Sequence, residues 1–155
     1  MANLRELGRY AQEHGVYIAP EVMNRFATDF LNTCADALRL VEEIGNPMLG
    51  LRLDIFIMNI EEKSLYGAIL GAGERLLDYQ GEDNDRDTPG TGTLDCRAVR
   101  AALLRIGYDR YVVIESFVPQ VLINGSVASI WRVAAGSNDE LAHSGVRFLK
   151  ALFQE

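Results

Sequence analysis

Glu21, Asp54 and Glu115 each close a short apolar run in the sequence. Short apolar runs that alternate with helical stretches are typical of buried parallel strands joined by crossover helices. The carboxyl ends of such strands meet at one edge or face of the sheet, which is where catalytic groups gather. Three carboxylates at that place would repel one another. We therefore expect a divalent cation, or retained protons, to relieve the repulsion.

The elements that must position these acids alternate along the chain. The pattern of apolar residues predicts strands at 16–21, 49–54, 76–80 and 111–115, and helices at 2–14, 28–44, 62–74, 95–106 and from about 138 onward. The polar stretch 81–93 is predicted to be a solvated loop. A helix followed by four strand–helix units indicates an α/β fold. We see no domain boundary, and therefore predict a single domain over residues 1–155.

Four parallel strands, with apolar residues on both faces, make an incomplete sheet. An open sheet of this kind leaves two edges unpaired. A (β/α)8 barrel closes on itself, but it needs eight strands and typically about 250 residues. The 155 residues of this chain supply about half of that. The prediction is half of a barrel that a second chain completes.

Composition narrows the range of partners. The formal net charge is −7, which disfavours nucleic acid or an anionic membrane as a partner. No apolar stretch is long enough to cross a bilayer, and the N-terminal residues lack the apolar core of a signal peptide. Cys34 and Cys96 form no CxxC pattern and are predicted to be buried thiols. We therefore expect a cytoplasmic protein without a disulfide.

Several segments in order along the chain resemble those of the ketose 3-epimerases, the D-tagatose and D-psicose 3-epimerases of the xylose-isomerase-like TIM-barrel superfamily. The segments are EVMNRF (21–26), LDIFIMNIEE (53–62), PGTG (89–92), IGYD (106–109) and VIESF (113–117). The resemblance covers nearly the whole chain, but only the C-terminal half of the family. It implies that the four predicted strands are strands five to eight of a TIM barrel.

The resemblance also implies roles for particular residues. Family members hold one divalent ion, usually manganese, through Glu, Asp, His and Glu at the ends of strands five to eight. The matching positions here are Glu21, Asp54, Gln80 and Glu115. In the family the two glutamates are thought to move the proton at C3 of a free ketose, one from each face. A substrate-contacting arginine of the family matches Arg86.

Three departures from the family pattern affect the same site. Gln80 replaces the histidine ligand, Ile57 replaces a substrate-contacting histidine, and Ala27 replaces an acid that contacts substrate. The two histidines of the chain, His14 and His143, lie in predicted helices away from the strand ends. An all-oxygen site would suit Mn²⁺ or Mg²⁺, with Ca²⁺ as a further candidate, but a metal-free remnant of such a site explains the residues equally well.

Two functions remain open from the sequence. One is a sugar epimerase or isomerase of carbohydrate metabolism with weak or lost activity, whose barrel is completed by a second copy. The other is a non-catalytic, truncated half-barrel that only self-associates. In either case we predict a homodimer in which the first strand of one chain pairs in parallel with the last strand of the other.

Overall fold

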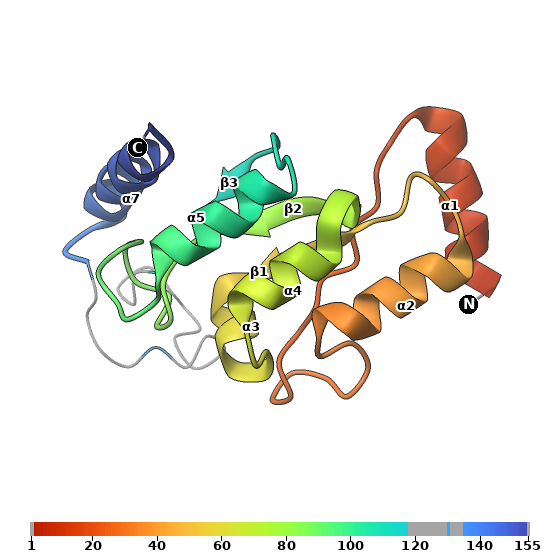
Figure 1. The fold of residues 1–155 in the computed structure, drawn as a ribbon, viewed down its shortest axis with the longest axis horizontal. Helices are drawn as coiled ribbons and strands as arrows, with labels where there is room; N and C mark the ends of the chain where they lie inside the picture. Colours follow the sequence, from red (N-terminus) through yellow and green to blue (C-terminus); the bar gives the residue numbers. More distant parts are fainter. Residues whose placement is uncertain (1, 118–129, 131–134, 155) are drawn as a thin grey trace.

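The computed structural model describes residues 2–117, 130 and 135–154, and within them a parallel sheet is covered on one face by a row of helices (Figure 1). No helix among these residues is long and apolar enough to cross a membrane. The elements are α1 (Ala2–His14), α2 (Cys34–Ile44), β1 (Leu51–Asp54), α3 (Ile55–Glu61), α4 (Leu65–Ala72), the 3-10 turn η1 (Gly73–Arg75), β2 (Leu76–Gln80), α5 (Cys96–Arg105), β3 (Val112–Val113) and α7 (Asn138–Gln154).

The strands follow one another across the sheet in chain order. β1 pairs in parallel with β2, and β2 pairs in parallel with β3. Asp54 lies opposite Gln80, and Gln80 lies opposite Val113. This register brings the ends of β1 and β2 level with each other. The predicted βα order is confirmed, although β1 and β3 are shorter than the sequence suggested.

The predicted strand at 16–21 is present only as isolated bridges along the free side of β1. Ile18 bridges to Leu49 and Glu21 bridges to Arg52, both in parallel. The Arg52 N–H donates to the Pro20 carbonyl at 3.0 Å, so the segment is hydrogen-bonded to β1. Pro20 itself has no N–H to donate. The segment also has a neighbouring strand on one side only, so only half of its backbone groups can pair within the sheet. The sheet therefore contains three regular strands and one irregular edge.

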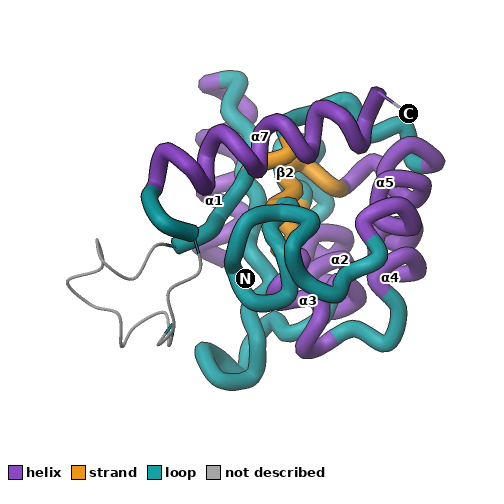
Figure 2. The backbone as a smooth tube through the Cα atoms, turned by 90° about the vertical axis from the view of Figure 1, so that its left-hand side faces the viewer, coloured by secondary structure: helices purple, strands orange, loops and turns teal. Residues whose placement is uncertain are grey.

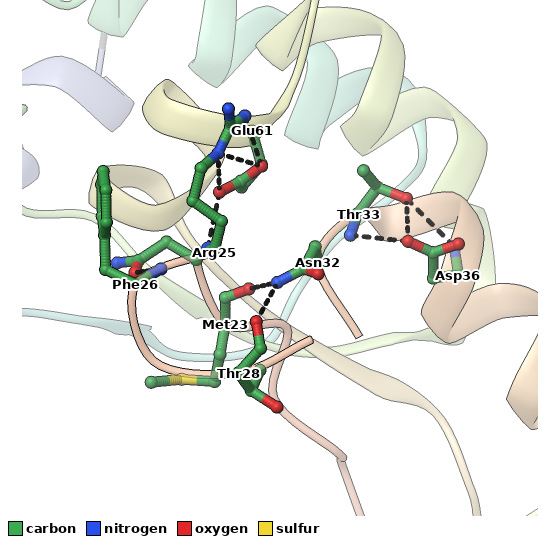
Figure 3. Close-up of polar contacts among 9 residues, drawn as sticks. Met23, Arg25, Phe26, Thr28, Asn32, Thr33, Asp36 and Glu61 are labelled. Atoms are coloured by element: carbon green, nitrogen blue, oxygen red, sulfur yellow. Dashed lines mark hydrogen bonds and ion pairs between the residues drawn. The ribbon is translucent and has the colours of Figure 1, made fainter. Parts of the chain in front are cut away.

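The start of α2 differs from the prediction. The apolar periodicity suggested a helix from residue 28, but α2 begins at Cys34 because Thr33 caps it. The Thr33 hydroxyl accepts the Asp36 N–H at 3.2 Å, and the Asp36 carboxylate accepts the Thr33 N–H at 3.1 Å (Figure 3). This capping box fixes the first turn. Phe30, which lies within the helix predicted at 28–44, is instead 66% exposed in the loop before α2.

The hydrophobic core lies between the sheet and its helices. α2 packs on α4, α4 on α5 and α5 on α7, so the helices form a continuous layer beside the strands (Figures 1 and 2). The core includes Leu51, Leu53, Ile69, Leu76, Tyr79, Ala102 and Leu103. Burial of these side chains is the main force that holds the helices on the sheet.

The other face of the sheet is polar in part, which corrects the expectation of apolar residues on both faces. Arg52 on β1 pairs with Asp78 on β2, with 2.9 Å between Nε and Oδ2. Both side chains are about one-third exposed. Arg52 lies between the buried Leu51 and Leu53 of β1, whereas burial does not alternate strictly along β2. Arg52 also lies 3.9 Å from Glu21, one of the three acids.

The two cysteines are free thiols, and the prediction that both are buried is confirmed for Cys34 only. Cys34 is buried, and its Sγ donates to the Ala68 carbonyl at 3.3 Å. Burial raises the pKa of Cys34 to about 12, and the nearby Glu62 carboxylate adds to the rise. Cys96 is only partly buried. Cys34 is therefore an unreactive packing residue rather than a nucleophile.

Candidate active site

The three acids singled out in the sequence meet at one place. One oxygen each from Glu21, Asp54 and Glu115 lies within 4.8 Å of the other two. Asp54 is fully buried, while Glu21 and Glu115 are partly exposed. Together with Gln80, whose side chain contacts Glu115, they form what we call the strand-end cluster: Glu21, Asp54, Gln80 and Glu115. The fold therefore brings side chains together from four separate parts of the sheet.

Asp54 is held in place by its role at a helix start. Its Oδ1 accepts the Ile57 N–H at 2.9 Å, which caps the N-terminus of α3. Aspartate is a favoured residue at this position because its carboxylate satisfies a free helix N–H. Its Oδ2 accepts a hydrogen bond from Arg86 at 2.6 Å. Both oxygens of this buried carboxylate are thus paired.

Gln80 ends β2 and faces Glu115. Its Nε2 donates to Glu115 Oε2 at 2.7 Å. Its Oε1 is buried and accepts no hydrogen bond from any described residue. A buried, unpaired carbonyl oxygen is costly unless a further group binds it. Gln80 therefore offers the cluster one oxygen that is free to accept a donor or a cation.

Arg86 reaches into the cluster from the loop after β2. Besides its contact with Asp54, it places an NH1 atom 3.2 Å from Glu115 Oε1. Its guanidinium lies over the rings of Phe56 and Phe117, at 4.8 and 5.2 Å from their centroids. The side chain is only 11% exposed. Arg86, predicted to contact substrate, is thus bound to two of the three acids.

Glu21 has the electrostatic character of a proton-transfer group. Burial raises its pKa, and the neighbouring carboxylates of Glu115 and Asp54 add to the rise, while Arg52 opposes it. The Arg52 Nε lies 3.9 Å from Glu21 Oε1. A carboxylate whose pKa moves toward neutrality is a better match for general acid–base chemistry.

The loop at 81–93 is not the solvated loop that the sequence predicted. Asp83 is fully buried within it. Its Oδ2 accepts the N–H groups of Gly90 and Gly92 at 2.9 and 3.0 Å, and its Oδ1 accepts the Asn84 N–H at 2.9 Å. The loop is therefore folded around one carboxylate. Sequence reasoning missed this because the partners lie up to eleven residues away and share no local pattern with Asp83.

Glu82 is a second buried acid that the sequence did not identify as a site residue. It is 1% exposed, and its carboxyl group lies beside that of Asp54. Burial raises its pKa to about 9, and the adjacent Asp54 carboxylate adds to the rise. Glu82 is therefore a neutral acid at pH 7, placed beside the strand-end cluster.

The residues that depart from the family pattern lie at different depths. Ile57 is buried in α3 at 1% exposure, whereas Ala27 is exposed on the loop before α2.

His14 and His143 are exposed on helices, as predicted, and His14 stacks on the ring of Tyr10. Among the described residues, the group of acids that can hold a metal includes no histidine.

The loop after Glu21 is fixed by side chains that Figure 3 shows pointing toward one another. The Arg25 backbone N–H and guanidinium both bind the Glu61 carboxylate, at 2.7 to 3.2 Å. Asn32 donates to the carbonyls of Met23 and Thr28 at 2.7 and 3.0 Å. The Arg25 contacts attach the loop to α3, and the Asn32 contacts join its two ends.

The donor atoms of the cluster suit a hard divalent cation. The three carboxylates make an all-oxygen set, which Mn²⁺ and Mg²⁺ accept. A histidine ligand would add an imidazole nitrogen and its orienting hydrogen bond, which Gln80 does not provide. The strand-end cluster therefore fits a divalent cation, but it offers one strong ligand fewer than a site with histidine at position 80.

Known proteins match this chain over most of its length. A family model described as "Xylose isomerase-like TIM barrel" matches residues 1–152. A D-psicose 3-epimerase from Enterocloster bolteae is 41% identical over 130 residues, which cover 84% of this chain and 43% of the relative. A ketose 3-epimerase from Arthrobacter globiformis is 37% identical over 142 residues, which cover 90% of this chain and 49% of the relative.

Solved structures show the same partial match. An L-ribulose 3-epimerase superimposes with a TM-score of 0.93 at 32% identity, over 99% of this chain and 52% of that chain. The D-allulose 3-epimerase from Methylomonas sp., solved with D-allulose, gives a TM-score of 0.90 at 32% identity, over 97% and 53% of the two chains. The chain spans about half the length of the curated relatives that it matches. The predicted half of a TIM barrel is confirmed.

Proposed function

This chain belongs to the xylose isomerase-like TIM barrel family, and on that premise we propose that it is a ketose 3-epimerase-related half-barrel with weak or lost activity. The observation that carries the proposal is the convergence of Glu21, Asp54 and Glu115 within 4.8 Å. The relatives that support the sugar class are 3-epimerases of D-psicose, L-ribulose and other ketoses.

Glu21 and Glu115 are the two groups that we assign to proton transfer at C3 of a free ketose. Glu21 ends the irregular segment 18–21 beside β1, and Glu115 follows β3. The two side chains therefore reach the cluster from opposite edges of the sheet. Burial raises the pKa of Glu21, which favours a group that takes up a proton during the reaction. A divalent cation held by the strand-end cluster would stabilise the negative charge that develops on the sugar oxygens.

Three features account for weak activity. Ile57 is buried and apolar, and the exposed Ala27 carries no polar group, so neither can bind a sugar hydroxyl. Gln80 donates an N–H to Glu115 rather than supplying an imidazole. Loss of positioning contacts lowers the rate steeply, by about tenfold for each 1.4 kcal/mol. The half-barrel alone also leaves one side of the sugar without protein contacts.

The test of this function is deuterium incorporation at C3 of D-fructose, D-tagatose or D-psicose in deuterated water with Mn²⁺. We expect little or no incorporation by the native chain, and any incorporation should disappear in Glu115→Gln. Rapid incorporation that Glu115→Gln abolishes would contradict the loss of activity and would identify Glu115 as the base. Incorporation that survives the substitution would contradict the assigned proton-transfer pair.

Restoring the histidine should strengthen metal binding. Gln80→His supplies an imidazole at the end of β2, opposite Asp54 in the sheet register. We expect Mn²⁺ to bind about tenfold tighter to this variant, in the range by which metal-site contacts change affinity. Calorimetric titration of both proteins measures the difference, with His143→Gln on the exposed face of α7 as the control. An unchanged affinity would mean that the four residues do not form one metal site.

The second candidate is a non-catalytic half-barrel that self-associates, and exposed apolar side chains at the sheet edges favour it. Val16 and Tyr17 precede the irregular edge segment at 55% and 52% exposure, and Tyr111 and Val113 lie on the opposite edge at 86% and 37%. We propose that a second copy covers both edges through a two-fold axis and closes an eight-stranded barrel. This association serves the epimerase-related function as well, because it supplies the missing half of the pocket.

A further inference from the structure

The layer of helices extends past both edges of the sheet. Within the described part of the chain, α2 follows the edge segment 16–21, α4 follows β1 and the short α3, α5 follows β2, and α7 follows β3. α1 precedes the edge segment and lies at the end of the layer opposite α7 (Figure 1). In a closed (β/α)8 barrel one helix follows each strand, and the helix after the last strand of one half covers the junction with the next half. Two copies would therefore bring two helices, α7 of one and α1 of the other, to each junction.

An apolar groove lies between α7 and β3, at the free edge of the sheet. It has a volume of about 390 Å³. Its apolar lining is formed by Val112, Ile114, Leu141, Ala142, Val146 and Leu149. A groove of this kind beside an unpaired strand is suited to an apolar segment that pairs with the strand and lies under the helix.

The edge segment 16–21 of a second copy has the side chains that this groove requires. Tyr17 faces the inner side of the sheet, where its ring lies 4.7 Å from the guanidinium carbon of Arg110. Because side chains alternate along an extended segment, Val16 and Ile18 face the opposite side, toward the helices. Val16 is exposed and Ile18 is half-buried. The helices of the same chain therefore cover this apolar side of the segment incompletely.

α1 is attached to the rest of the chain through small residues. The buried residues of this helix are Gly8 and Ala11, and its Tyr10 is 60% exposed. By contrast, α7 buries the larger side chains of Leu141 and Leu152. The free energy that holds a helix on a sheet increases with the apolar area that it buries. Of the two helices that would meet at a junction, α1 is therefore the easier to displace.

We propose that α1 of one chain and α7 of the partner copy compete for one position over the junction, and that pairing of the copies displaces α1. The edge segment then lies in the groove of the partner copy, whose α7 covers Val16 and Ile18. When α1 stays on its own chain, it keeps that position occupied and opposes pairing. This inference rests on the proposed pairing of two copies and identifies the element that regulates it.

A reversible covalent link between α1 and its own chain tests the competition. A Cβ at Gly8 would lie 3.2 Å from the Cβ of Asn46, close to the separation of about 3.5–4.5 Å in a disulfide. The double variant Gly8→Cys with Asn46→Cys can therefore hold α1 in its position. By light scattering at micromolar concentration we expect the mass of one chain for the oxidised variant and of two chains after reduction. Gly8→Cys alone is the control and should have the mass of two chains with or without a reductant.

A larger residue at position 8 should act in the opposite direction. A Cβ at Gly8 would lie 3.0 Å from the Leu49 side chain, so Gly8→Val strains the contact of α1 with its own chain. Because displacement of α1 relieves this strain, we expect the dissociation constant of the dimer to fall at least about tenfold, measured by analytical ultracentrifugation. Gly71→Val on α4 is the matched control, because no described atom lies within 4 Å of a Cβ there. Its dissociation constant should equal that of the native chain.

The outcomes separate the competition from the pairing itself. The mass of two chains for the oxidised double variant, or an unchanged dissociation constant for Gly8→Val, would overturn the competition and leave the pairing of two copies standing. Single chains for the native protein and for Gly8→Val alike would overturn both. Single chains for the native protein with pairs for Gly8→Val would support the competition, because α1 then keeps the native copies apart. No sugar is present in these measurements, so the result of the C3 exchange stands independently.

Discussion

Glu82→Gln is expected to stabilise the protein at neutral pH, by about 3 kcal/mol in the free energy of unfolding at pH 7. The pKa of Glu82 is about 9 in the folded chain, well above its ordinary value of 4.5. Between these values the folded chain retains a proton that the unfolded chain releases. Stability is therefore lost as the pH rises through this window. Glutamine remains neutral at every pH and removes that loss.

Urea unfolding at pH 4, 6 and 8, at one protein concentration, measures this effect. The difference in the free energy of unfolding between Glu82→Gln and the native chain should be small at pH 4 and should increase toward pH 8. Glu42→Gln changes an exposed glutamate on α2 and should show no such increase. If the Glu82→Gln difference is the same at all three values, Glu82 is ionised in the folded protein and its pKa is not raised.

Asp83→Ala should be the most damaging single change in the loop at 81–93. The substitution removes the acceptor for the N–H groups of Gly90, Gly92 and Asn84, all of which bind a fully buried carboxylate. Gly90 and Gly92 are exposed, so water replaces part of the lost pairing. Each lost hydrogen bond then costs about 1 kcal/mol, and we expect a total loss of about 3 kcal/mol in the free energy of unfolding. Because Arg86 lies in the same loop, its contact with the strand-end cluster should loosen as well.

Hydrogen exchange distinguishes local from global damage in Asp83→Ala. The amides of Gly90 and Gly92 should exchange much faster in the variant. The exchange rates of the β2 amides should change only as far as the global free energy of unfolding changes. Asp29→Ala alters an exposed acid in the loop before α2 and should leave both sets unchanged. Equal protection of Gly90 and Gly92 in Asp83→Ala and the native chain would contradict the central role of the Asp83 carboxylate.

The sequence predicted those parts of the fold that depend on local pattern. The segment 76–80 is a strand with the predicted bounds, because its apolar residues and neighbouring turns are sufficient to define it. Asp54 could be placed at a strand end for the same reason, whereas Glu115 lies two residues beyond the end of β3. By contrast, the start of α2 depends on one hydrogen-bonded pair, Thr33 with Asp36, which overrides the apolar periodicity that begins at residue 28. Periodicity alone does not locate such a cap.

The electrostatic character of the site could not be predicted in the same way. Arg86 was expected to contact a substrate, but its contacts with Asp54 and Glu115 join parts of the chain about thirty residues away. Glu82 and Asp83 belong to a stretch whose composition is typical of a solvated loop, yet both are buried. Burial of an acid depends on which distant groups surround it, and sequence composition does not identify those groups.

We propose that the chain is half of a barrel and that a second copy completes it. Light scattering on the purified chain at micromolar concentration tests this claim most directly. We predict the mass of two chains, with Val113→Lys shifting the protein to single chains, because a charge on β3 opposes pairing at that edge. Leu104→Lys, on the exposed surface of α5, should leave the mass at two chains. A native chain with the mass of a single copy would contradict the claim.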